Sequence, residues 1–343
     1  MTTASKYDKL TELPENLKEA IDWILRVTGK DGSGGSQNGT DALSEEVKNV
    51  LDKDAAEVSR GVLEVMGGVI DSLVTDLNDD RSPGKNHDHS TFRGFKAYLK
   101  SFKGNLENVR DYGSSVSGEE LVKLKGWLAG QPSGPIEKLA DGLKTFVKTN
   151  SGIFQGSYVY VYNKSNATWP SKPDDQRTCA LIFLGIAPIL FYTLLFLYWV
   201  CSDGTPSWKN NNLSSDEPLK KFMEKMGFKT ELNGSKKGED VATLIGTTCF
   251  TEISKAWPKS NSNYATLVNY NGVSTTSSPS TSPLYYCYYI ATSFFTPNNT
   301  HTVETTSPAT PSFAGYSGVT ALAGGAYGLN VGGLNTFLNA LLV

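Results

Sequence analysis

Residues 179–201 read CALIFLGIAPILFYTLLFLYWVC, a run of 23 residues with no charged side chain and one aliphatic hydroxyl, that of Thr193. As a straight helix this run would be about 34 Å long, and the hydrocarbon core of a bilayer is about 30 Å thick. Tyr192, Tyr198 and Trp199 would suit the boundary between lipid and water, where amphipathic rings gather. The run therefore predicts either a membrane-spanning helix or an apolar segment buried at the centre of the protein.

The two alternatives make different use of the residues within and beside the run. Membrane helices tolerate the kink that Pro188 would introduce, whereas a buried helical hairpin would turn at Gly185 or Pro188. Cys179 and Cys201 would lie about 33 Å apart in one helix and could pair only in a hairpin. The flanking positive charges are Lys164, Lys172 and Arg177 on one side and Lys209 on the other. For a spanning helix, the positive-inside rule would place the preceding region in the cytosol.

The region before the run, residues 1–150, is predicted to be an antiparallel helical bundle. Apolar residues recur every three to four positions in several separate stretches, and each such stripe needs a partner because short helices are marginal alone in water. Pro14 suits a first helical position. The predicted stripes are Leu17–Leu25, Val47–Leu77 as one long helix, Phe92–Val109, Leu121–Leu128 after a capping box at Ser117 and Glu120, and a helix starting at Pro135.

The rest of the chain divides by composition. Residues 151–178 are predicted to be an irregular connector, in which Tyr158–Tyr162 would suit a strand or an extended loop equally. Residues 202–260 return to a short helical region, in which Leu219, Phe222, Met223 and Met226 share one face that ends at Gly227. Residues 261–312 are rich in Ser, Thr and Pro and are predicted to be disordered. Residues 313–343 form a Gly- and Ala-rich apolar tail, either a second membrane-associated segment or a frayed end.

Charge and cysteine content exclude several classes of protein. The 343 residues carry a formal net charge of -3, and the only charged residue after Lys259 is Glu304. Such a balance offers no basic face for nucleic acid. Cys179, Cys201, Cys249 and Cys287 lack zinc-site spacing and are expected to be unpaired thiols. Residues 1–14 are polar, so we expect no ordinary signal peptide there.

No residue pattern predicts a catalytic, cofactor-binding or metal site, and we expect no enzyme. His87-Asp88-His89 is the only histidine cluster, and a solvated loop explains it. The Gly-rich segment 32–39 lacks the Lys-Ser/Thr of a phosphate-binding loop. Six sequons are candidates for N-glycosylation: Asn38, Asn163, Asn166, Asn212, Asn233 and Asn298.

One segment near the N-terminus carries a family resemblance. Residues 10–31, LTELPENLKEAIDWILRVTGKD, resemble the opening of the variant erythrocyte surface antigen-1 family of Babesia parasites. Similar segments follow in the same order: IEKLADGL at 136–143, ALIFLGI at 180–186, LYW at 197–199, and the Gly/Ala-rich tail around 324–330. Full members of that family are far longer and have a Cys/Lys-rich region. This chain has four cysteines and lacks such a region, so it resembles a short or truncated member.

The resemblance implies a function in contact with the host. It implies a membrane protein on the infected-erythrocyte surface, acting in antigenic variation, immune evasion and cytoadhesion to host endothelium. Its partners would be a sister subunit in an alpha/beta heteromer, host antibody and an endothelial receptor. The alternative is a non-displayed structural or trafficking protein of the parasite that associates with membranes.

Overall fold

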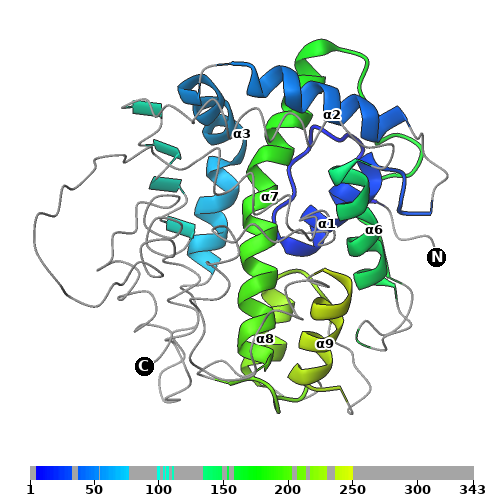
Figure 1. Ribbon diagram of the computed structural model, residues 1–343, viewed down its shortest axis with the longest axis vertical. Coiled ribbons are helices and arrows are strands. Elements are labelled where there is room, and N and C mark those ends of the chain that lie inside the picture. The colour runs from blue at the N-terminus through cyan, green and yellow to red at the C-terminus, as the bar shows by residue number, and fades with distance from the viewer. Residues whose placement is uncertain are drawn as a thin grey trace, which may run out of the picture.

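The computed structural model describes residues 5–32, 38–53, 55–76, 99–100, 103–104, 106–107, 110–111, 134–148, 153, 158–202, 207–213, 217–229 and 236–249. Of these residues 68% are helical and none belongs to a strand, which confirms the mainly α prediction. The helices are α1 (Leu17–Val27), α2 (Asn38–Leu51), α3 (Ala55–Asp76), α6 (Pro135–Val147), α7 (Pro173–Ser202), α8 (Pro218–Lys225) and α9 (Gly238–Thr248). Figure 1 shows α7 passing through the middle of this arrangement.

The apolar run forms one continuous helix, α7, of 30 residues. The helix begins at Pro173, six residues before the apolar run, with Asp174 and Asp175 in its first turn. A proline at the start has no N–H to lose, and acidic side chains there favour the positive end of the helix dipole. The helix continues through Pro188, so the hairpin alternative is wrong. An internal proline removes one backbone hydrogen bond of the helix. The buried apolar residues on both sides of Pro188 keep the helix continuous despite this loss.

The helix α7 lies inside the protein. It contacts α9, α2, α3 and α1, and every residue from Cys179 to Phe191 is buried. It is long and apolar enough to cross a membrane, yet 94% of its most apolar window is enclosed by the rest of the chain. Burial of this much apolar surface makes α7 the centre of the hydrophobic core.

Two glycines set the spacing between α3 and α7. A Cβ atom on Gly61 of α3 would meet the side chain of Leu181, and one on Gly185 of α7 would lie 3.1 Å from the Cβ of Met66. The absence of these side chains lets the two backbones approach closely, so α3 and α7 interlock along the buried run.

The long stripe predicted over residues 47–77 is two helices. The chain leaves the first at Asp52 and Lys53, whose amides still donate to Lys48 and Val50, and α3 starts at Ala55. Both α2 and α3 contact α7. Gly61, Gly67 and Gly68 lie within α3 without interrupting it.

The other helix boundaries follow local chemistry. The first helix starts at Leu17 and not near Pro14, because the Asn16 side chain accepts a hydrogen bond from the Glu19 amide and caps it. Pro135 begins α6, as predicted. The predicted apolar face of α8 is buried, and the chain leaves α8 through Gly227, whose φ of 87° suits glycine.

Several predictions fall on other parts of the chain. Of the stripe at 92–109, Leu99 and Leu106 are described, and both are buried. The other predictions lie outside the described residues. They concern the capping box at Ser117 and Glu120, residues 250–260, and all of 261–312 and 313–343.

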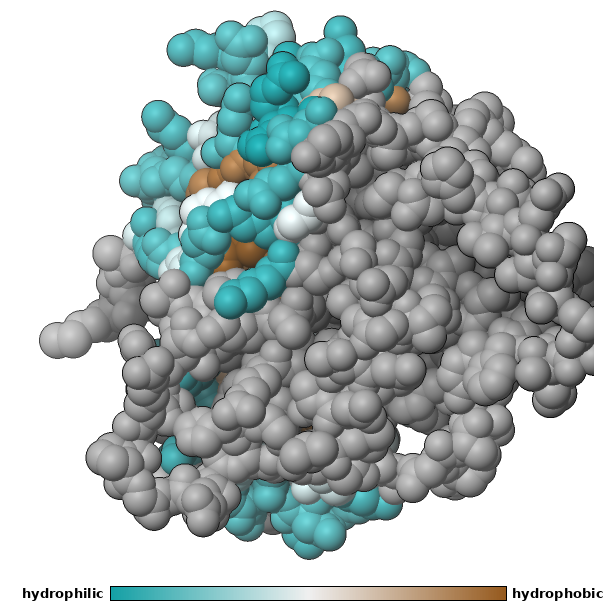
Figure 2. Space-filling model, turned by 90° about the vertical axis from the view of Figure 1, so that its left-hand side faces the viewer, coloured by the Kyte–Doolittle hydropathy of each residue, from teal (hydrophilic) through white to brown (hydrophobic). Residues whose placement is uncertain are grey.

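The described surface is polar. Figure 2 shows hydrophilic side chains over most of the coloured part of one face, with small hydrophobic areas between them. Among the described large hydrophobic residues, Val159 is exposed, at 46%.

Candidate functional site

The first helix buries its charged side chains as well as its apolar ones. Seven of its eleven residues are apolar, and every residue except Lys18 is buried. Glu19, Asp22 and Arg26 are only 6%, 0% and 6% exposed. Buried charges require partners, so the polar side of α1 must meet groups that neutralise it.

Those groups come from residues 5–16 and from the connector segment, residues 158–172, which precedes α7. The amides of Lys6 and Tyr7 donate to the Val161 carbonyl at 2.8 and 3.0 Å, and the Asn163 amide donates to the Tyr7 carbonyl at 2.8 Å. Tyr7 and Tyr162 form a parallel bridge and stack with ring centroids 4.7 Å apart. Of the two predicted alternatives for residues 158–162, the structure shows the extended loop, which carries one isolated bridge at Tyr162.

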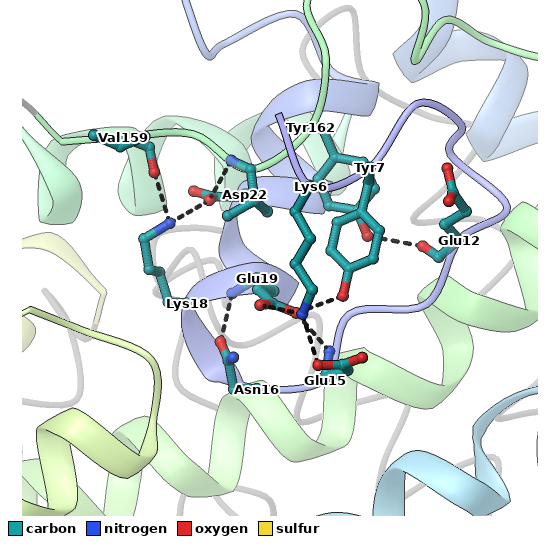
Figure 3. A network of polar contacts seen from close by, with 11 residues as sticks. Lys6, Tyr7, Glu12, Glu15, Asn16, Lys18, Glu19, Asp22, Val159 and Tyr162 are labelled. Carbon is teal, nitrogen blue, oxygen red and sulfur yellow. Dashed lines mark hydrogen bonds and ion pairs between the residues drawn. The ribbon is translucent and has the colours of Figure 1, made fainter. Parts of the chain in front are cut away.

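Asp22 joins α1 directly to the connector segment. Its Oδ2 accepts from Lys18 Nζ at 2.6 Å and from the Val161 amide at 3.1 Å, and Lys18 also donates to the Val159 carbonyl at 2.7 Å (Figure 3). Burial raises the pKa of Asp22 to about 6, against the attraction of Lys18. The carboxylate thus holds the segment in place at a cost in desolvation.

Glu19, one turn away, is better satisfied. Its carboxylate accepts from Tyr7 Oη at 2.8 Å, Lys6 Nζ at 3.0 Å and the Glu15 amide at 2.9 Å (Figure 3). Burial acts to raise the pKa of Glu19, but these donors outweigh it and lower the pKa overall. Two carboxylates on one helix therefore have pKa values shifted in opposite directions.

Three further contacts extend this network. Arg26 Nε donates to the Ala167 carbonyl at 2.8 Å, and its Nη1 contacts Asp31 at 3.0 Å. Tyr162 Oη donates to the Glu12 carbonyl at 2.8 Å. We call the contacts of Lys6, Tyr7, Glu12, Lys18, Glu19, Asp22 and Arg26 with one another and with residues 159–167 the α1 latch. It fixes the connector segment against α1 just before α7 begins.

The latch is suited to holding the fold together. Its carboxylates accept hydrogen bonds from lysine, tyrosine and backbone donors of the same chain, which neutralise the charges on the buried face. Within the described residues, no group of three or more His, Cys, Asp or Glu is placed to hold a metal ion. His87 and His89 lie outside the described residues.

The predicted sequon residues occupy different settings. Asn38 begins α2, and the amide groups of Asn163 and Asn166 both donate to Asp8, at 2.9 and 3.2 Å. Asn166 is exposed and Asn163 is half-buried. The backbone amide of Asn212, also half-buried, donates to Glu217. Asn233 and Asn298 lie outside the described residues.

The predicted membrane residues all lie on α7. Cys179, Pro188 and Cys201 are buried, and Tyr198 is half-buried. Tyr192 and Trp199 belong to the helix, but the structure describes only their backbone. Cys179, Cys201 and Cys249 are free thiols, as expected, and Cys287 is not among the described residues.

The latch was not predicted from the sequence. A solvated face is the usual explanation for Glu19, Asp22 and Arg26 in a helix. The sequence of α1 agrees with that explanation, because its seven apolar residues share one side of the helix and Lys18, Glu19, Asp22 and Arg26 lie together on the other. Burial of the charged side depends on residues 5–16 and the connector segment, which the periodicity of α1 does not identify.

Searches of protein-family models, of curated proteins and of solved structures find no match to this chain.

Proposed function

We propose that this chain is a short relative of the variant erythrocyte surface antigen-1 family and serves as a display scaffold on the infected red cell. Its function would lie in contacts with antibody, a sister subunit or an endothelial receptor. The observation that carries the proposal is the role of the resembling segment, residues 10–31. Three of its charged residues, Glu19, Asp22 and Arg26, are buried and make their contacts within the α1 latch.

A scaffold separates residues that fold from residues that are recognised. Loops tolerate insertion and substitution because the elements they connect keep their own packing. Here the latch and α7 would provide the constant core. The segments proposed for variation are 79–90 and 261–312, chosen for their polar, turn-rich composition. Segment 30–42 has a similar composition, but residues 38–42 belong to α2 and Asp31 is buried. In this proposal the helices form an antiparallel bundle and 261–312 is disordered.

A second candidate is a non-displayed membrane-associated component of the parasite. One observation favours it: positive residues precede α7 more densely than they follow it. If α7 spans a membrane in this orientation, the latch would face the cytosol.

Surface labelling of lysines separates the two candidates. Intact infected cells would be treated with a membrane-impermeant amine reagent, and peptides containing the exposed Lys53 and Lys164 would be measured by mass spectrometry. Display predicts labelling of both on intact cells, to the level seen after lysis. Labelling only after lysis would reject display and favour the second candidate. An abundant parasite cytosolic protein that stays unlabelled before lysis is the control.

A further inference from the structure

We propose that α7 is a membrane-insertable helix stored inside the protein, and that lipid acyl chains can replace the helices that cover it. The helices in question, α1, α2, α3 and α9, are called the shell. The proposal goes beyond surface display, because it concerns how the folded chain enters a bilayer and not where the protein is exposed.

The first step is that the three aliphatic hydroxyl groups of α7 bond to carbonyls of their own helix. Its apolar run has no charge, and the buried Thr193 hydroxyl donates to the Ile189 carbonyl of the same helix at 2.6 Å. Near the two ends, Thr178 and Ser202 likewise donate to carbonyls one turn earlier, at 2.9 and 2.8 Å. A helix that satisfies its own hydroxyl groups can move into lipid without leaving them unpaired.

The second step is that two polar contacts join α7 to its surroundings near its two ends. Arg177 contacts Glu57 of α3 at 2.8 Å, where both side chains are exposed, and the Trp208 amide donates to the Val200 carbonyl at 2.7 Å. Between these points the shell packs through apolar side chains such as Met66 against Gly185. Lipid tails are as apolar as these side chains, so the same surface of α7 can be buried in either environment.

The third step is that two helices of the shell, α1 and α2, are suited to lie at the membrane surface after they leave α7. The helices α1 and α2 each combine apolar and charged residues. Amphipathic helices can lie in the interface with their apolar side toward lipid. The α1 latch joins α1 to residues 159–167, which precede α7, so insertion leaves the latch intact.

The test is to staple the shell to α7 and measure insertion. A Cβ on Gly185 lies 3.1 Å from that of Met66, slightly inside the usual separation of about 3.5–4.5 Å in disulfides. The full-length double variant Met66→Cys/Gly185→Cys would be purified oxidised and reduced. Each form would be incubated with vesicles of equal parts phosphatidylcholine and phosphatidylserine, then digested. Mass spectrometry would quantify a vesicle-protected peptide covering residues 179–201.

The reduced form and the natural chain should yield the protected peptide, and the oxidised form should yield at least ten-fold less. Equal yields from the oxidised and reduced forms, or no protected peptide from the natural chain, would overturn the proposal. Circular dichroism of both forms before lipid is added checks that the staple preserves the helices.

A second pair of variants avoids the staple. Glu57→Lys places a positive charge opposite Arg177 and weakens the contact between α3 and α7, whereas Glu45→Lys makes the same charge change in a pair within α2. Exposed pairs contribute up to about 1 kcal/mol, so Glu57→Lys should raise the yield of protected peptide about two- to five-fold over Glu45→Lys. Equal yields would count against release of α7 from the shell. Vesicle insertion and cell-surface labelling are separate measurements, so failure of one leaves the other interpretable.

Discussion

At the scale of single residues, Asp22 and Glu19 show how burial and hydrogen bonding compete. The two carboxylates lie three positions apart on α1 and are both buried. Desolvation prevails at Asp22, whose pKa is raised to about 6, whereas the donors of Lys6, Tyr7 and Glu15 prevail at Glu19, whose pKa is lowered. The latch therefore stabilises the fold with opposite dependences on pH at its two carboxylates.

The pH dependence of stability tests this difference. The pKa of Asp22 is higher in the folded state than its ordinary value of 3.8, so the folded protein binds more protons between about pH 4 and 6. Its contribution to stability is therefore largest at low pH and is lost as the pH rises through 6. For Glu19 the contribution is present above its ordinary pKa and is lost as the pH falls through its lowered value.

Asp22→Asn isolates the first contribution. The difference in unfolding free energy, natural chain minus variant, should increase by about 2 kcal/mol between pH 7 and pH 4. Denaturant unfolding at several pH values would measure it. A difference that stays constant, or that decreases toward pH 4, would contradict the account of Asp22.

Gly227 provides a second prediction at this scale. Its φ is 87°, and a Cβ there would collide with the Asn16 side chain that caps α1. Gly227→Ala should therefore lower the unfolding free energy by about 1–3 kcal/mol, through backbone strain and displacement of Asn16. Gly67→Ala is the matched control: Gly67 lies within α3 with open space around its Cβ direction, so this change should raise stability by up to about 1 kcal/mol. Thermal and denaturant unfolding would measure both.

At the scale of elements, the backbone amide of Val161 is one of the contacts that attach the connector segment to α1. Val161→Pro removes the N–H that donates to Asp22 and should loosen residues 158–167 from α1. We expect a loss of about 1–3 kcal/mol, because a buried acceptor loses a partner. Val159→Pro is the control, since it keeps the carbonyl that Lys18 uses. Limited proteolysis between α6 and α7 should accelerate in the first variant and not in the second.

Several elements were predictable from periodicity, and the failures have physical causes. The stripes at Leu17–Leu25, after Pro135 and at Leu219–Met226 became α1, α6 and α8, because each has one dominant apolar side. Periodicity did not predict the break between α2 and α3, because the apolar residues of both helices continue one repeat across residues 52–54. The continuity of α7 through Pro188 also depends on tertiary context.

The latch was the least predictable part of the fold. Asp22 and Val161 are 139 positions apart, and no local pattern relates them. Periodicity describes the sides of a helix but does not identify which segment covers a charged one. The apolar residues of α1 predicted burial of one side only, and the burial of Glu19, Asp22 and Arg26 on the other side follows from contacts with distant segments.

At the scale of the whole molecule, the chain is organised around α7. The apolar run that suggested a membrane span is enclosed by α1, α2, α3 and α9, and the latch fixes the segment that leads into it. This arrangement is compatible with a display scaffold and with storage of an insertable helix. Both proposals require that α7 be covered by protein in the absence of lipid.

Thiol accessibility tests that requirement most directly. Cys179 and Cys201 lie at the two ends of the apolar run, and both are fully buried. The purified full-length chain, free of detergent and lipid, would be treated with a bulky thiol reagent, and peptides carrying each cysteine would be quantified separately by mass spectrometry. The account predicts that both thiols react only when denaturant unfolds the chain. Rapid labelling of both in native buffer, or a chain that dissolves only with detergent, would contradict it.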